Sequence, residues 1–494
     1  MADAPDAARA PAEHELPADL SAVLDECVVA TRAARDDETK RMYRRAVEEF
    51  LRRVVATPEV KIDKALIDSY VAEIDHRLSL QIDEILHHPD VQKLESAWRG
   101  LKFVVDQTDF RENMKIHILN VSKDELLEDF ENSPEIPKSG LYQHIYTAEF
   151  GTAGGEPIGA MIANYEFGPG PRDIALMQKV SAVAAMAHCP FVAAAGPEMF
   201  GVDDFRELPK LKDLQSIFEG PQYTKWNSFR DTPDSRYFAL TMPRFLLRHP
   251  YDPDANPVKA FNYSEQVTDD HRKYLWGNAS FAFATRLSDS FARSRWTMNC
   301  TGPQAGGMVQ NLILHQYKTL EGIETKIPTE VLISDRREFE LAESGFIGLT
   351  MYKNTDKACF FSANSVQKPK TYPDTKEGQR DQTNYKLGTR LPYMMMISRL
   401  AHYLKVIQRD NLQTWQSPTK MQTELSDWMR QYAADMDNPT AEVADRRPIR
   451  KFNIEVSEVP GEVGFYKVDM QVMPHLKFEG ANFTLSLVGK LDKE

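Results

Sequence analysis

Few residues of this 494-residue chain are arranged in a way that could support catalysis or ligand binding. His188 and Cys189 offer an imidazole and a thiol, the two groups of a cysteine nucleophile pair. Adjacent residues rarely face one another, so we expect a packed core histidine and cysteine instead. His87 and His88 precede a proline at a predicted helix end, where imidazoles can bind terminal carbonyls. No nearby third ligand completes a metal site there.

Two further patterns have a structural explanation as well as a chemical one. The segment Gly-Pro-Gly-Pro at 168–171 stands just before a predicted helix, where backbone N–H groups often bind anions, but its two prolines remove donors and favour a turn. We interpret Glu125, Glu128, Asp129 and Glu131 as a solvated helix face rather than an acid and base pair. Six aromatic residues indicate core or interface rather than a cofactor pocket: Tyr274, Trp276, Phe281, Phe283, Phe291 and Trp296.

The familiar catalytic sequence signatures do not occur in the chain. It has no phosphate loop, no HExxH zinc motif, no GxSxG nucleophile elbow and no set of kinase motifs. The sequence therefore predicts no catalytic residue, no metal site and no cofactor.

Composition restricts the class of protein. With 42% apolar and 27% charged residues the chain is globular, and 494 residues exceed what one hydrophobic core usually supports. The formal charge of −13 repels phosphate backbones, which argues against a nucleic-acid partner. Four scattered cysteines without a CxxC pair are typical of a reducing compartment: Cys27, Cys189, Cys300 and Cys359. No leader or membrane-spanning stretch is visible, so we expect a cytoplasmic protein without direct membrane insertion.

The amino-terminal part is predicted to be helical after a flexible tail at 1–15. An arm at 16–62 begins with a short amphipathic helix, whose apolar stripe is Leu16, Leu20, Val23, Leu24, Cys27 and Val28. A second helix has the stripe Tyr43, Val47, Phe50, Leu51, Val54 and Val55 and ends before Thr57-Pro58. A third helix, capped by Asp63, continues to His88.

The central part, 63–375, alternates strands with helices, which predicts an α/β fold with a mixed or parallel sheet. Helices are expected from Val91 to Val105, where Leu94, Trp98 and Leu101 have helical spacing, and after the capping-box sequence at 122–125. Further helices are expected at 172–188 and 277–293. Strands are predicted at 115–121, 157–165, 191–195, 236–241, 330–333, 346–352 and 358–362.

The carboxyl-terminal part, 376–494, changes character. A polar stretch at 367–384 indicates a boundary or a long surface loop, and two helices follow at 387–410 and 418–434. Three strands are then expected at 449–456, 465–472 and 483–487. Phe483, Leu485 and Leu487 alternate with polar residues, so one face of this unit is apolar and needs cover. Three strands also leave open edges, and we expect strands from neighbouring protomers to complete the sheet.

Long segments of the chain resemble the TssC family, also called ImpC, EvpB or VipB. The resemblance follows the order of the sequence from about residue 65 to the end, and it is carried by ESAWRGLK at 95–102, DQTDFREN at 106–113, SGLYQHIYTAEFG at 139–151, ANYEFGPGPRDIALMQKV at 163–180, LWGNASFAFATRLSDSFA at 275–292, TNYKLGTRLPYMMM at 383–396 and GANFTLSLVGKLD at 480–492.

The resemblance implies a structural protein, the large subunit of a type VI secretion contractile sheath, with no cofactor and no enzymatic activity. Such a subunit pairs with a small subunit, TssB, and the pairs stack into a helical polymer around the Hcp tube and on baseplate proteins. The AAA+ ATPase ClpV then recognises an amino-terminal helix, here the stripe from Leu16 to Val28. The terminal strands with Phe483, Leu485 and Leu487 link protomers, and the helix with Glu424, Asp427 and Arg430 is a candidate tube-facing surface. Two alternatives stay open at this point: an α/β enzyme with a site built from scattered residues, and a cytoplasmic scaffold unrelated to secretion.

Overall fold

The computed structural model describes residues 64–150, 152–319, 322–411, 417–436, 439–458, 466–475 and 485–490. The tail, the stripe from Leu16 to Val28 and the second predicted helix lie outside these residues. The chain divides into two compact units, of which the first contains 249–274 with the segment up to Val91, and the second contains 92–248 with 275–494.

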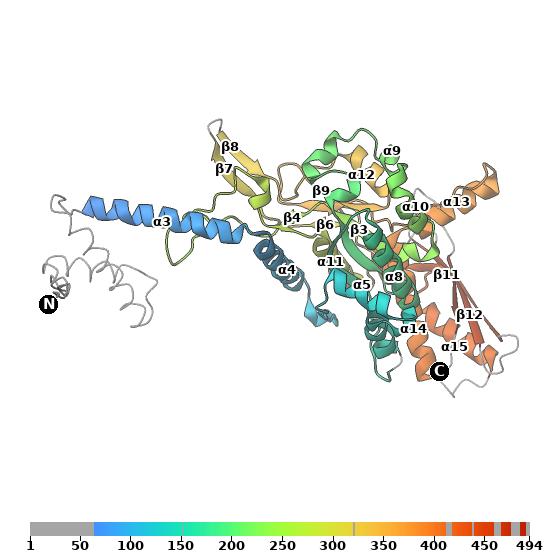
Figure 1. The fold of residues 1–494 in the computed structure, drawn as a ribbon. Coiled ribbons are helices and arrows are strands. Elements are labelled where there is room, and N and C mark those ends of the chain that lie inside the picture. The colour runs from blue at the N-terminus through green and yellow to red at the C-terminus, as the bar shows by residue number, and fades with distance from the viewer. Residues whose placement is uncertain are drawn as a thin grey trace, which may run out of the picture. The chain divides into compact units, whose positions relative to one another are not determined.

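The elements keep the alternating order that the sequence predicts (Figure 1). The helices are α3 (Lys64–Leu86), α4 (Pro89–Asp106), α5 (Lys123–Asn132), α6 (Gly140–Tyr142), α7 (Ala148–Phe150), α8 (Pro171–Ala187), α9 (Leu214–Phe218), α10 (Thr224–Arg230), α11 (Ala279–Ser294), α12 (Asp335–Glu343), α13 (Lys376–Gly388), α14 (Leu391–Asp410), α15 (Pro418–Arg430) and α16 (Ala441–Arg446). The strands are β1 (Met161–Phe167), β2 (Phe191–Ala195), β3 (Phe238–Met242), β4 (Phe245–Leu246), β5 (Trp276–Gly277), β6 (Met308–Val309), β7 (His315–Thr319), β8 (Gly322–Lys326), β9 (Phe346–Met351), β10 (Ala358–Phe360), β11 (Ile449–Glu458), β12 (Tyr466–Pro474) and β13 (Leu485–Lys490).

The second unit is built on a central six-stranded sheet in the order β1-β2-β3-β9-β10-β6. Strands β1, β2, β3 and β9 are parallel, and β10 runs antiparallel to both of its neighbours. Helix α8 connects β1 to β2, which makes a βαβ unit. The α/β class with a mixed sheet is therefore confirmed.

Side chains of the central strands alternate between two hydrophobic cores. Phe191, Phe238 and Phe346 pack in the first core with helix α8 and the large side chain of Trp226 on α10. The next residues along each strand, such as Val192, Ala239 and Ile347, pack in the second core with helix α11 and the first turn of α14. Because both faces are covered, the strands are continuously apolar rather than alternating.

Local signals fixed several element boundaries. Ser122 caps α5: its hydroxyl accepts from the Glu125 N–H at 3.2 Å, and the Glu125 carboxylate accepts from the Ser122 N–H at 2.7 Å. This is the predicted capping box.

The packing of α4 on α11 depends on a glycine. A Cβ on Gly100 of α4 would lie 2.4 Å from the Phe281 ring, so glycine permits the close approach of the two helices.

Three expectations about local structure were wrong. Residues 115–121 form no strand, because no partner strand lies beside them in the described structure. Residues 330–333 run beside β4 with a single backbone bond at Glu330, to Arg244, and form no ladder of their own. The polar stretch predicted as a loop contains helix α13, whose lysine, glutamate, glutamine and arginine residues are good helix formers.

Candidate assembly surfaces

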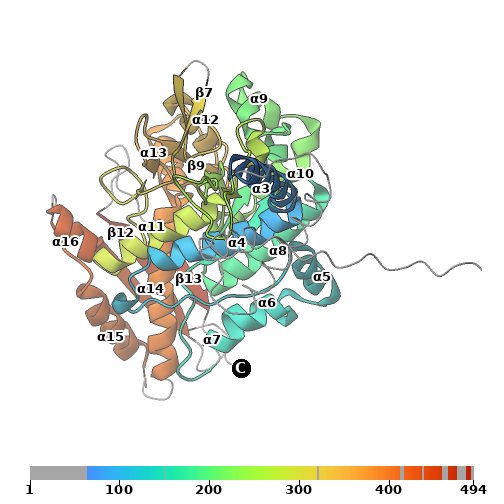
Figure 2. The same ribbon diagram turned by 90° about the vertical axis from the view of Figure 1, so that its left-hand side faces the viewer.

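The terminal sheet has three described strands in the order β11-β12-β13, all antiparallel (β11 and β12 are labelled in Figure 1, and β13 in Figure 2). Strands β11 and β12 present alternate residues to opposite faces. Ile449, Ile454, Met470 and Val472 are buried, whereas Lys451, Asn453, Glu455 and Gln471 are exposed. One face of the sheet is therefore apolar and the other polar, as the sequence predicts.

The apolar face of this sheet is covered by helices of the same chain. Leu400 and Met396 of α14 pack there together with Leu425 and Met429 of α15, and both helices lie beside the sheet in Figures 1 and 2. In the described strands β11 and β12 the apolar face is therefore covered. A neighbouring protomer is not needed for it, because the amphipathic helices between 391 and 430 supply the apolar side chains.

What remains open is the edge of the sheet. The register places Leu485 opposite Val472 and Leu487 opposite Met470 in the pair of β12 with β13. Phe483 lies outside the described residues. Within the described structure β13 pairs with β12 alone, so its other edge presents main-chain donors and acceptors that no described strand meets.

The three residues that we expected to face the inner tube lie on the outer side of α15. Glu424 carries a weak ion pair with Lys420 at 3.9 Å, and Asp427 pairs with Arg430. All three side chains are exposed, at 46% for Glu424, 58% for Asp427 and 71% for Arg430. Trp428 points instead into the core of the terminal unit, where it packs on Tyr403 and Tyr432.

A surface that the sequence did not reveal lies on α4. Leu94 and Trp98 gave the helical spacing, and such a stripe ordinarily faces the core. Their side chains are 62% and 65% exposed, however, while Gly100 and Val104 form the buried side. Large apolar side chains this exposed on a helix indicate an interaction surface.

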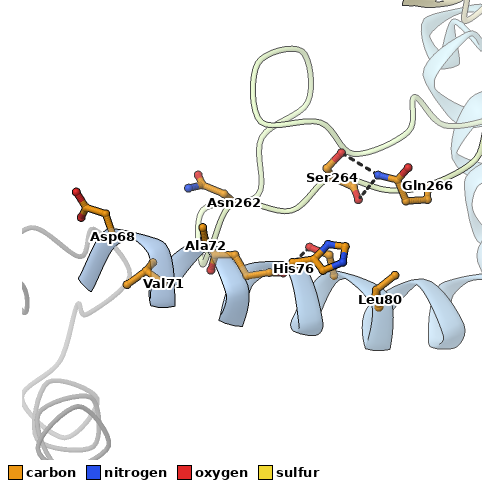
Figure 3. Close-up of a pocket in the computed structure, with 10 residues that line it drawn as sticks. Asp68, Val71, Ala72, His76, Leu80, Asn262, Ser264 and Gln266 are labelled. Carbon is orange, nitrogen blue, oxygen red and sulfur yellow. Dashed lines mark hydrogen bonds between the residues drawn. The ribbon is translucent and has the colours of Figure 1, made fainter. Parts of the chain in front are cut away.

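The first unit has a groove of about 450 Å³ between α3 and the loop that contains Asn262, Ser264 and Gln266. Figure 3 shows the loop residues on one side and Asp68 and His76 of the helix on the other. The dashed bonds in the loop join the Gln266 amide to Ser264. The Ser79 hydroxyl in its wall donates to the Asp75 carbonyl, and Ser264 accepts from the Gln266 amide, so both serines of the groove have structural bonds rather than a catalytic base beside them.

The residues that could have supported chemistry have structural roles. Cys189 is fully buried, and burial raises the pKa of its thiol, which keeps it protonated. Asp173 lies in the first turn of α8, and its carboxylate accepts from the Gly168 N–H at 2.8 Å and pairs with Lys123 at 2.8 Å. A carboxylate of the chain itself thus occupies the position that an anion would take. Asp129 accepts from the Gly140 N–H at 3.0 Å. His87 lies 3.2 Å from the Glu265 carboxylate.

The buried His402 of α14 joins α14 to the end of α8, where the partly buried His188 follows the last helical residue. His402 Nε2 donates to the Ala187 carbonyl at 3.0 Å, and His188 Nδ1 lies 3.0 Å from the Tyr237 hydroxyl. Burial lowers the pKa of His188 to about 3 and that of His402 to about 4, and the Lys405 ammonium contributes to both shifts. Both imidazoles are therefore neutral in the folded protein near neutral pH.

These lowered pKa values predict acid sensitivity of the fold. Below pH about 6.5 the unfolded chain binds protons that the folded chain does not, so the free energy of unfolding falls by up to about 1.4 kcal/mol per pH unit for each imidazole. The loss continues until the folded pKa values near 3 and 4 are reached. His402→Gln keeps a donor for Ala187 without a titrating group and should make this slope shallower in urea denaturation at several pH values. His88→Gln, at an exposed histidine, is the control, and equal slopes in both variants would contradict the prediction.

Among the helices of the described residues, none is both long and apolar enough to cross a bilayer.

Comparison with solved structures gives distant matches. A sheath tail protein from Listeria innocua has a TM-score of 0.34 and 12% identity, over 66% of this chain and 56% of that one. A chain of the anti-feeding prophage baseplate has a TM-score of 0.33 and 10% identity, over 78% of this chain and 81% of that one. This chain thus spans little more than half of the Listeria protein.

Comparison of sequences gives much stronger matches. Residues 68–367 match the VipB family model, described as the EvpB tail sheath N-terminal domain, and residues 380–491 match the model described as the EvpB tail sheath gpW/gp25-like domain. The type VI secretion system sheath protein TssC1 of Pseudomonas aeruginosa is 40% identical over 432 residues, which is 86% of either chain. The chain therefore belongs to the TssC (EvpB/VipB) family of type VI secretion sheath proteins, a structural and non-enzymatic family whose members assemble with other sheath subunits into a polymer.

Proposed function

We propose that this chain is the large subunit that pairs with the small subunit TssB and polymerises around the Hcp tube in the bacterial cytoplasm. Contraction of the polymer on its baseplate propels the tube and its effectors, and ClpV recycles the contracted sheath. In this proposal residues 63–375 form the central sheath domain and 376–494 the domain that links protomers. Residues 16–62 form the arm for ATPase recognition.

The observation that carries the proposal is the open edge of the terminal sheet. The apolar face is already covered by α14 and α15, so a neighbouring chain needs to supply only main-chain pairing at β13. A strand added at an edge is a strong and specific connection between chains. Such links hold protomers together while their packing changes from one stable arrangement to another, which contraction requires.

Co-expression with TssB tests the proposal. Long hollow tubules in negative stain are the expected result. A protein that stays monomeric and turns over a metabolite would instead support the enzyme alternative, and a complex with TssB that never polymerises would contradict the sheath role.

The outward side of α15 is the proposed contact with the Hcp tube. Glu424→Lys together with Arg430→Glu reverses the local charge pattern and should lower the fraction of tubules with an inner tube by about tenfold, because like charges across an interface oppose docking. Glu442→Lys with Arg446→Glu is the matched control, since these two exposed residues of opposite charge lie on α16 and form an ion pair at 3.6 Å. Unchanged tube filling in the α15 variant would remove α15 from the contact.

A further inference from the structure

Helix α3 is attached to its own unit by its polar side. Ser79 and Asp83 are buried, and the Asp83 carboxylate accepts from the Tyr263 hydroxyl at 2.6 Å and from the Gln266 N–H at 3.2 Å. Ser79 turns its hydroxyl back to the Asp75 carbonyl at 2.7 Å. Polar contacts with the loop at 249–274 therefore hold the helix in this unit.

The other side of α3 is an exposed apolar stripe. Val71, Ile74, Leu78 and Ile85 are 49%, 44%, 40% and 55% exposed, with Val71 at the edge of the groove, and the half-buried Ile67 extends the row toward the start of the helix. Steps of four and three residues separate Ile67, Val71, Ile74 and Leu78, the spacing of a seam between two packed helices. A helix that binds its own unit through polar residues and turns its apolar stripe to water lacks a partner.

We propose that residues 43–55 of the same chain cover this stripe, folding back on α3 as an antiparallel helical hairpin. These residues lie outside the described structure, and their sequence predicts a helix with the stripe Tyr43, Val47, Phe50 and Val54.

The two stripes match in spacing and direction. Antiparallel pairing makes every layer between the two helices apolar. The layers are Val54 opposite Ile67, Phe50 opposite Val71, Val47 opposite Ile74 and Tyr43 opposite Leu78. The connection at 56–63 has the length usual between neighbouring antiparallel helices, and it contains the Thr57-Pro58 pair that ends the first helix.

The charges of the two segments are opposite. Residues 40–56 carry six basic and two acidic side chains, a net charge of +4, whereas 64–86 carry two basic and five acidic side chains, a net charge of −3. The register sets Arg44 near Asp75. Pairing α3 with α3 of a second copy would set acidic flanks against each other, and the short connection gives residues 43–55 a high effective concentration that a separate chain lacks.

The hairpin would give residues 16–28, the proposed helix for ATPase recognition, a folded base in this unit. This consequence rests on the proposed function, whereas the hairpin itself does not.

Cross-linking within the full-length chain tests the register. In a Cys27→Ser background, where the three described cysteines are buried, Val47→Cys with Ile74→Cys should join in nearly every molecule with a short bis-maleimide and stay monomeric on a denaturing gel. Val47→Cys with Leu80→Cys is the control, because Leu80 is exposed but lies off the stripe. Equal yields for the two pairs, or cross-linked dimers, would overturn the proposal, and dimers would show that a second copy covers the stripe.

Limited trypsin digestion tests the contact without new cysteines. Arg44, Arg45, Arg52 and Arg53 should be protected in the wild-type chain without any partner, and cleavage there should be about tenfold faster in Ile74→Asp, since proteolysis follows local opening. Leu80→Asp is the matched control, because the side chain of Leu80 is 47% exposed and that of Ile74 is 44% exposed. The four arginines should stay protected in this variant. Rapid cleavage at these sites in the wild type, or the same rate in both variants, would contradict the hairpin. A sheath that assembles while the hairpin tests fail would leave the proposed function intact.

Discussion

Deletion of residues 481–494 should leave a protein that still pairs with TssB and forms no tubules. The deletion removes β13, the edge strand of the terminal sheet, while β11, β12, α14 and α15 keep the apolar core of this unit. The loss should therefore fall on the connection between protomers rather than on folding. Electron microscopy of the co-expressed proteins measures tubules, and co-purification measures the pair with TssB.

A single substitution should reproduce this effect. Leu485 lies in register with Val472, and Leu485→Pro removes a donor and clashes with strand pairing, so tubules should again be lost. Asn453→Ala, on the exposed polar face of β11, should form normal tubules, since main-chain bonds supply the link. Tubules of normal length from the truncated protein would show that these strands do not join protomers.

Leu20→Asp with Leu24→Asp should abolish ATPase-dependent disassembly while sheaths still assemble. The stripe from Leu16 to Val28 is predicted to dock in a hydrophobic groove of ClpV. Burying two leucines contributes roughly 4 kcal/mol, so their replacement by aspartate should weaken binding by about a thousandfold. Turbidity of contracted sheaths with the ATPase and ATP measures disassembly.

The control for this experiment changes charge off the stripe. Asp19→Asn with Asp25→Asn should leave disassembly at the wild-type rate. Normal disassembly by the leucine variant would exclude recognition through this stripe. A leucine variant that fails to assemble at all would show that the helix packs on its own protein.

The sequence determined the local elements of this protein, because their signals lie within a few residues. The capping box at Ser122 begins α5, the apolar run from Phe191 to Ala195 is β2, and the alternation after Ile449 gives the terminal strands. The family could also be recognised from the sequence, since its long segments occur in order. No catalytic residue was predicted, which agrees with a structural family.

Only the tertiary structure decided which surface each stripe meets. A helical period identifies an apolar side, but burial depends on segments far away in the chain. For Leu94 and Trp98 the stripe that predicts the helix is the exposed side, whereas Leu425 and Met429 of α15 cover the terminal sheet. A strand likewise needs a partner for its backbone bonds. Residues 115–121 have the sequence pattern of a strand but form none, because no other strand of the described structure lies beside them. Periodicity is a property of neighbours in sequence, while cover and pairing are properties of neighbours in space.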